Sequence, residues 1–151
     1  DELNVGKIGK PIDLLEPVEM KNNSAEDIIL MKAIDNFQLR KFSEATHKLR
    51  TFIERYPFST RYAEANFLLG SSFFEINEYD SAANAYLDSF VADPSGENAP
   101  RSLVGLAVSL EQINQSEQAC LTLKEAKARY SVEVKKILDD MDKDKKLSKC
   151  N

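Results

Sequence analysis

The chain of 151 residues has no tryptophan, one histidine, two cysteines, and only five glycines and five prolines. So little histidine and cysteine argues against a metal centre built from these residues and leaves few side chains for nucleophilic catalysis. Five glycines and five prolines are few for a β-rich or disordered chain of this length. No glycine-rich phosphate loop is present, so we expect no cofactor and no enzymatic activity.

Basic side chains are also in the minority, with 20 Lys and Arg against 25 Asp and Glu. A formal charge of −5 argues against a nucleic-acid partner. No apolar run approaches the roughly 18 residues needed to span a bilayer, so we expect no membrane insertion. The chain opens with Asp1-Glu2-Leu3-Asn4 and no signal-like apolar core, which predicts a cytosolic protein, a mature form or an excised domain.

The negative charge is concentrated in one part of the sequence. Residues 61–100 contain seven acidic side chains and one basic one, and the rest of the chain is close to neutral. A localised field of this kind steers a cationic partner toward it. It is also what an ordinary solvated helix surface looks like, and the sequence leaves both interpretations open.

A repeat with a period of 37 residues organises the chain. Small residues recur at Ala33, Gly70 and Ala107 and again at Ala45, Ala82 and Ala119, while Pro57 and Pro94 share the interval with Ser131. A period of this size is typical of stacked helical hairpins, in which small residues let paired helices approach closely and proline ends the second helix. The hydrophobic spacing predicts helices near 24–38, 42–56, 60–76, 79–92, 98–113, 116–130 and 132–147.

The repeat resembles the tetratricopeptide repeat, and five residues match positions of its signature: Gly70, Phe73, Ala82, Tyr86 and Pro94. The resemblance implies an all-α, tetratricopeptide-like superhelix of three hairpins plus a C-terminal capping helix. We expect residues 1–22 to be a linker or irregular arm and residues 23–151 to be the repeat domain. The repeats would span about 24–60, 61–97 and 98–131, and the capping helix about 132–147.

Several segments resemble one family of this class more closely. Residues 52–59 (FIERYPFS), 63–70 (AEANFLLG), 79–83 (YDSAA), 99–103 (APRSL) and 118–123 (QACLTL) are similar to the carboxy-terminal domain of the Tol-Pal system protein YbgF, or CpoB, of alphaproteobacterial type. The resemblance implies a periplasmic adaptor in cell division that binds TolA, and the peptidoglycan synthase machinery is a second expected partner. It would couple outer-membrane constriction to septal peptidoglycan synthesis. The family's amino-terminal coiled coil, which makes it trimeric, is absent from these residues, so we expect this piece to be monomeric.

The two cysteines, Cys120 and Cys150, stand 30 residues apart. In a reducing cytosol they would be ordinary thiols. In the periplasm, where the resemblance puts the protein, they can form a disulfide that ties the capping helix to the last hairpin.

The resemblance also implies a concave binding groove lined by the first helix of each hairpin. The residues carried over from the family's groove positions are Leu30, Ile34, Phe37, Glu64, Phe67, Ser71, Phe74, Glu75, Arg101, Val104, Val108 and Glu111. An apolar floor with charged edges suits a peptide or helix with apolar anchors and net positive charge. The competing interpretation is that the aromatic residues belong to the core and that the acidic ones are simply solvated.

Two other functions fit the same pattern. An outer-membrane assembly factor of the BamD type also has long-spaced tetratricopeptide repeats, but that family has five repeats and a lipidated amino-terminal cysteine. A helical accessory domain of a cell-wall enzyme is the other alternative, and it would need a catalytic glutamate in a second lobe.

Overall fold

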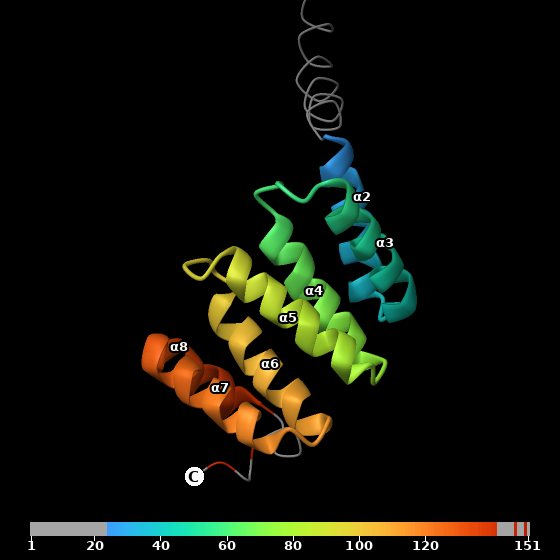
Figure 1. The fold of residues 1–151 in the computed structure, drawn as a ribbon. Helices are drawn as coiled ribbons and strands as arrows, with labels where there is room; N and C mark the ends of the chain where they lie inside the picture. Colours follow the sequence, from blue (N-terminus) through green and yellow to red (C-terminus); the bar gives the residue numbers. More distant parts are fainter. Residues whose placement is uncertain (1–23, 142–146, 148–149, 151) are drawn as a thin grey trace, which may run out of the picture.

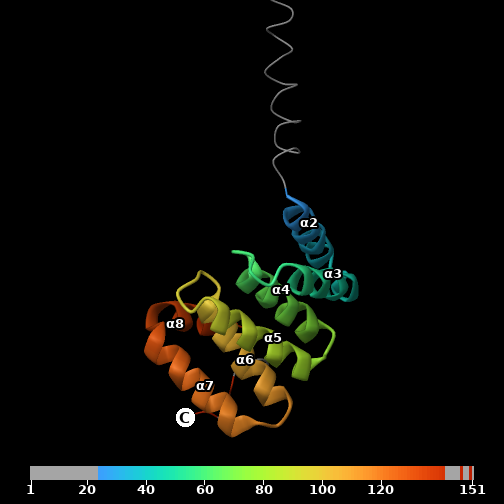
Figure 2. The ribbon, with the colours of Figure 1, turned by 45° about the horizontal axis from the view of Figure 1, so that its top comes forward.

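The computed structural model describes residues 24–141, 147 and 150. The described part contains seven helices and no strand: α2 (Ala25–Gln38), α3 (Phe42–Arg55), α4 (Tyr62–Glu75), α5 (Tyr79–Ala92), α6 (Ala99–Gln112), α7 (Ser116–Arg129) and α8 (Ser131–Asp140). Figures 1 and 2 show them stacked in chain order as three hairpins, α2 with α3, α4 with α5 and α6 with α7, with α8 beside the last. The predicted all-α architecture is confirmed. The predicted amino-terminal arm, residues 1–22, lies outside the described residues.

The 37-residue period of the sequence is also the period of the helices. The six helices of the hairpins are each 14 residues long, and α2, α4 and α6 begin at Ala25, Tyr62 and Ala99. The repeated small residues lie where helices cross: Ala33, Ala45, Ala82, Ala107 and Ala119 are all 0% exposed. Their small side chains let neighbouring helices pack closely, which is the role that the sequence predicted.

The short turn inside each hairpin depends on one residue with a left-handed backbone. Arg40, Asn77 and Asn114 have φ angles of 60°, 64° and 63°, and each lies between the two helices of its hairpin. Asparagine tolerates this conformation better than most residues, whereas arginine does not. The sequence analysis missed this repeated position.

The carboxy-terminal helix is shorter than expected. We predicted a helix over about 132–147, but α8 ends at Asp140 and Met141 takes an extended conformation. Farther along, Leu147 is buried in the core and Cys150 forms a disulfide with Cys120 of α7, with the two Cα atoms 5.3 Å apart.

Helix ends account for two further details of the fold. Ser24 caps α2 in a capping box with Asp27, whose amide donates to the Ser24 Oγ over 3.2 Å. At α7 the cap position is Gln115, and the Ser116 hydroxyl instead donates to Glu111 over 3.3 Å. None of the helices in residues 24–141 is both long and apolar enough to cross a bilayer.

Candidate binding groove

A cavity of about 300 Å³ lies between α2, α4, α5 and α6, and we call it the aromatic cavity. Eight of the twelve predicted groove residues line it, together with Tyr86, Gly105 and Met141. The eight are Phe37, Phe67, Ser71, Phe74, Glu75, Arg101, Val104 and Val108. The period of the sequence therefore brings together residues of three repeats at one site.

The other four predicted groove residues lie elsewhere. Leu30 is 0% exposed, so its assignment to the groove floor is wrong and it belongs to the core. Ile34 is half-buried against that core. Glu64 is engaged by Arg61, and Glu111 accepts the hydrogen bond from Ser116.

The bottom of the aromatic cavity is almost closed to solvent, whereas its walls are open. Val104 and Val108 are only 3% and 5% exposed. Phe37, Phe67 and Phe74 are half-buried and pack against the core with part of each ring left accessible. Both competing interpretations of the aromatic residues therefore hold in part, since the same side chains support the core and line the cavity.

An edge-to-face contact fixes two of the rings. Phe37 packs on Phe42 at a centroid distance of 5.4 Å, and Phe74 packs on Tyr79 at 5.0 Å. Each pair joins the end of one helix to the first residue of the next, one repeat apart. The third repeat has the Glu111–Ser116 hydrogen bond at the equivalent pair of positions. Rings held in this way lose little side-chain freedom when a ligand binds.

Tyr86, which the sequence analysis did not assign to the groove, also lines the aromatic cavity. It is 7% exposed, its ring centroid is 5.9 Å from that of Phe67, and its hydroxyl lies 3.1 Å from the Ser71 Oγ. A Cβ atom on Gly70 would come within 2.9 Å of the Tyr86 ring, and one on Gly105 within 2.6 Å. The two glycines thus make room for the tyrosine between α4 and α6.

Burial also changes the chemistry of this phenol. It raises the pKa of Tyr86 to about 12, with the Ser71 hydrogen bond opposing that shift and the nearby Glu75 carboxylate adding to it. At neutral pH the hydroxyl is therefore un-ionised and contributes a polar group to an otherwise apolar floor. The recurrence of Leu49 and Leu123 at its repeat positions, with a glycine on each neighbouring helix, is the sequence signal that could have identified it.

A charged cluster connects the first two repeats near the amino-terminal ends of α2 and α4. Arg61 contacts Glu64 over 2.9 Å and Asp27 over 3.4 Å. The hydrogen bond to Glu64 raises the pKa of the Arg61 guanidinium, and hydrogen bonds from Ser24 lower the pKa of the Asp27 carboxyl. Because these groups are partly exposed, the pairs contribute little to stability but orient the charges at this edge.

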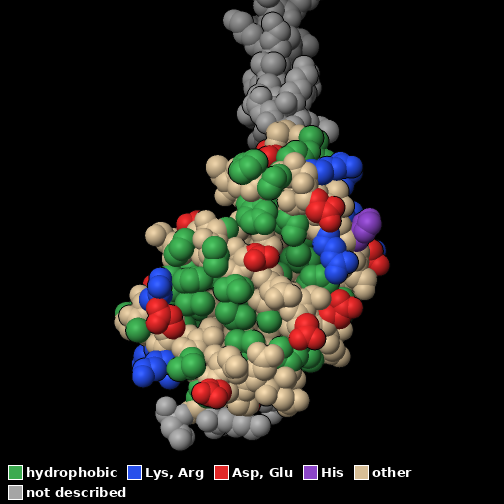
Figure 3. All heavy atoms as spheres, viewed as in Figure 1, with side chains coloured by type: hydrophobic (Ala, Val, Ile, Leu, Met, Phe, Trp, Pro, Cys, Tyr) green, Lys and Arg blue, Asp and Glu red, His purple; other side chains and the backbone are tan. Residues whose placement is uncertain are grey.

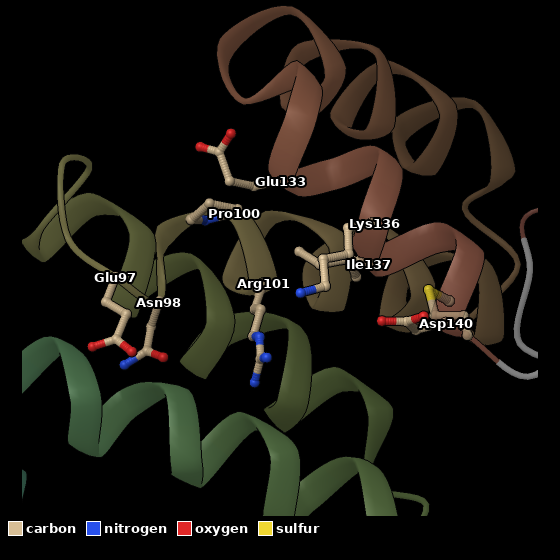
Figure 4. A pocket seen from close by; sticks show the side chains of 9 residues that line it. Glu97, Asn98, Pro100, Arg101, Glu133, Lys136, Ile137 and Asp140 are labelled. Carbon is tan, nitrogen blue, oxygen red and sulfur yellow. The ribbon is translucent and has the colours of Figure 1, made fainter.

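A second cavity, of about 440 Å³, separates the start of α6 from α8. We call it the α6–α8 cleft, and Figure 4 shows its lining. The cleft and the aromatic cavity are both lined by Arg101 and Met141, so the two are neighbours. In residues 24–141, 147 and 150, no group of three or more His, Cys, Asp or Glu side chains is placed to hold a metal ion.

The fold and the groove together define an all-α, tetratricopeptide-like repeat protein. No family model and no curated protein matches the chain. Among solved structures, the one described as "MamA AMB-1 C2221" superposes with a TM-score of 0.61 at 20% identity, over 83% of this chain and 71% of that one. A second, "Crystal structure of MamA protein", gives a TM-score of 0.62 at 21% identity, over 85% and 69%. At this identity the likeness establishes the fold alone.

Proposed function

We propose that this chain is a non-enzymatic adaptor that binds a segment of another protein in its groove. The observation that carries the proposal is the aromatic cavity, where eight residues that the family resemblance implied for a groove surround one space of about 300 Å³. Apolar anchors of a partner would displace water from its rings and from Val104 and Val108, while Glu75 and Arg101 at its edge set the orientation. This is recognition by surface, for which helical-repeat scaffolds are typical.

We further propose that the adaptor acts in the Tol-Pal system, with TolA as its partner, in the periplasm. The sequence segments that resemble the YbgF (CpoB) family support this assignment. The Cys120–Cys150 disulfide supports an oxidising compartment. The acidic surplus of residues 61–100 supports a partner segment with net positive charge.

The deciding measurement is the affinity of the oxidised protein for a purified TolA segment. Phe74→Ala removes an aromatic wall, and truncating such an anchor costs about 1–2 kcal/mol, a loss of roughly 5-fold to 30-fold in affinity. Glu75→Lys should weaken binding by a smaller factor that shrinks as salt is added.

Phe58→Ala is the matched control. Phe58 is 97% exposed on the loop between α3 and α4 and does not line the aromatic cavity, so its removal should leave the affinity unchanged. Circular dichroism of each variant establishes that the fold is intact. Equal affinities for wild type, Phe74→Ala and Glu75→Lys would mean that TolA does not use the groove.

The enzymatic alternative has its own test. Incubation of the protein with purified peptidoglycan should release no soluble fragments, because an adaptor contributes surfaces rather than reacting groups. Release of muropeptides by the wild type would contradict the non-enzymatic assignment.

A further inference from the structure

The first helix of the stack exposes an apolar face. Figure 1 shows α2 and α3 at one end of the stack and α7 and α8 at the other. Ile28 and Met31 of α2 are 42% and 48% exposed, and Leu39 at the C-cap of the same helix is 66% exposed. Spacings of three and eleven residues from Ile28 place all three on one side of the helix. We call these three side chains the α2 stripe.

The equivalent positions of the later repeats are buried. One and two periods after Ile28 are Ala65 of α4 and Ser102 of α6, and both are 0% exposed. Asp35 is exposed on the same side of α2, and the residues one and two periods after it are serines that are also 0% exposed. The α2 stripe therefore lies on a face that has a covering neighbour in the second and third repeats.

That neighbour is the second helix of the preceding hairpin. The Ser102 Oγ of α6 donates to the Ser89 Oγ of α5 over 3.0 Å, and a Cβ atom on Gly105 of α6 would meet the Tyr86 ring of α5. Met31 stands two periods before Gly105, so a second helix placed before α2 would pack on the α2 stripe. Among the described residues no helix precedes α2.

The sequence before α2 has the length and the apolar pattern to cover this face. One period before α3 lies the segment 5–18, and residues 19–24 would supply the same six-residue link that joins α3 to α4 and α5 to α6. Its apolar residues fall one period before three residues of α3 that are 0% exposed: Ile8, Ile12 and Leu15 precede Ala45, Leu49 and Phe52. The apolar side that α3 turns toward the core thus recurs in the segment before α2.

Two prolines distinguish this segment from the other second helices. Pro11 and Pro17 would interrupt a helix over 5–18, but Pro11 suits the first position of a short helical turn that carries Ile12 and Leu15 on one side. A cover of this kind packs less closely than a full helix and leaves room for larger side chains beneath it. The helix α2 has isoleucine and methionine where α6 has serine and glycine.

A second copy of the chain fits the α2 stripe less well. A stable protein–protein interface buries about 800 Å² on each partner. Three partly exposed side chains on one helix of 14 residues offer much less than this. A segment joined to Ser24 by a short link is already at a high effective concentration, so it needs far less contact area to dock.

We propose that residues 11–16 dock on the α2 stripe, with Ile12 and Leu15 against Ile28 and Met31, and extend the stack by a partial repeat. The interaction is separate from the aromatic cavity and does not depend on what the groove binds. The docked segment would give the amino-terminal end of the stack the cover that α8 gives the other end.

Methyl-resolved NMR of the oxidised full chain tests the docking directly. NOE cross-peaks are expected between the methyl groups of Ile12 or Leu15 and those of Ile28 or Met31. Leu15→Asp should abolish the remaining cross-peaks of Ile12 and shift the methyl signals of Ile28 and Met31. The methyl signals of Leu121, which is 60% exposed on α7, should not move.

Leu14→Asp is the matched control, because it makes the same change one residue away. The equivalent positions of α5 and α7 are already acidic and exposed, at Asp88 and Glu125. This variant should therefore keep the cross-peaks and the methyl shifts of the wild type.

The outcomes separate the possible occupants of the α2 stripe. Loss of the cross-peaks in Leu15→Asp but not in Leu14→Asp, to the same extent in dilute and concentrated samples, supports the proposal. Absence of the cross-peaks in the wild type, or equal changes in both variants, refutes it. In a mixture of isotope-labelled and unlabelled chains, cross-peaks between chains together with concentration-dependent Ile28 shifts would assign the stripe to a second copy and overturn the proposal.

Discussion

The close fit of Tyr86 between two helices makes a sharp prediction about Gly105. On an ordinary helix, Gly→Ala stabilises the fold by about 1 kcal/mol, because alanine has the higher helix propensity. Here a Cβ atom on Gly105 would lie 2.6, 2.7 and 2.8 Å from three carbon atoms of the Tyr86 ring. Real Cβ atoms do not approach carbon so closely, so the ring or α6 must move.

The direction and size of the stability change follow from the cost of overpacking and the gain in helix propensity. The ring cannot retreat easily, because α4 also passes close to it: a Cβ atom on Gly70 would lie 2.9 Å from the ring. Overpacking of a well-packed core costs about 1–3 kcal/mol, and three short contacts favour the upper half of that range. After the propensity gain is subtracted, Gly105→Ala should destabilise the protein by about 1–2 kcal/mol, a fall in Tm of roughly 4–8 °C.

The assay is chemical and thermal unfolding followed by circular dichroism, on a double-mutant cycle with Tyr86→Leu. Leucine is the residue at the equivalent positions 49 and 123, so this background keeps an apolar side chain in the gap. Without the ring, Gly105→Ala should become neutral or stabilising. If Gly105→Ala stabilises the wild type, or has the same effect in both backgrounds, then the ring is not what requires a glycine at this position.

Three further predictions concern stability. Burial raises the pKa of Tyr86 from 10.0 to about 12, so the stabilisation from its neutral form is complete below pH 10 and is lost as the pH rises toward 12. Measurements of the unfolding free energy at increasing alkaline pH should show this decline in the wild type and a smaller one in Tyr86→Phe. Arg40→Asn should raise the unfolding free energy by about 0.5 kcal/mol in urea titrations. It relieves the backbone strain of an arginine with a left-handed φ angle but removes the cation–π contact between Arg40 and Phe42. A decrease would show that the ring contact outweighs the strain. Reductant should lower the Tm of the wild type, because a crosslink over 30 residues contributes on the order of 3–4 kcal/mol. The Tm of the double variant Cys120→Ser/Cys150→Ser should not change. An unchanged Tm of the wild type after verified reduction would contradict a stabilising role of the disulfide.

The helices were predictable because small residues recur at the same interval as the helices. A buried alanine at a crossing cannot be replaced by a larger side chain without separating the helices, so Ala45, Ala82 and Ala119 mark the register directly. Eight of the twelve groove residues that the family resemblance implied line the aromatic cavity, and they occupy matching positions of the three repeats. The register of a helix is set by residues close together in the sequence, so a single sequence is enough to predict it.

What could not be predicted depends on contacts between repeats. Leu30 has the spacing of a groove residue, but in the first repeat the same face of α2 packs on α3 and α4 and buries it completely. Tyr86 belongs to a second helix and enters the cavity only because Gly70 and Gly105 leave a gap. The end of α8 at Asp140 was also missed, although the Cys120–Cys150 disulfide was expected, because the apolar spacing continues past that residue.

The composition of the surface adds little to what the sequence indicates about a partner. Figure 3 shows hydrophobic side chains interspersed with acidic ones over the middle of the stack, and basic ones nearer its sides. On this evidence a charge count by segment could suggest the sign of a partner. The place proposed for that partner rests instead on the shape of the aromatic cavity.

The disulfide has a mechanical consequence for α8. The bond between Cys120 and Cys150 closes a covalent ring that contains α7 from Cys120 onward, Tyr130 and the whole of α8. Tension applied to the chain beyond Cys150 therefore enters the fold at Cys120 and bypasses α8. The helix α8, which lines the α6–α8 cleft, would stay in place while the hairpins carry the load. In the reduced chain the same pull would peel α8 away first.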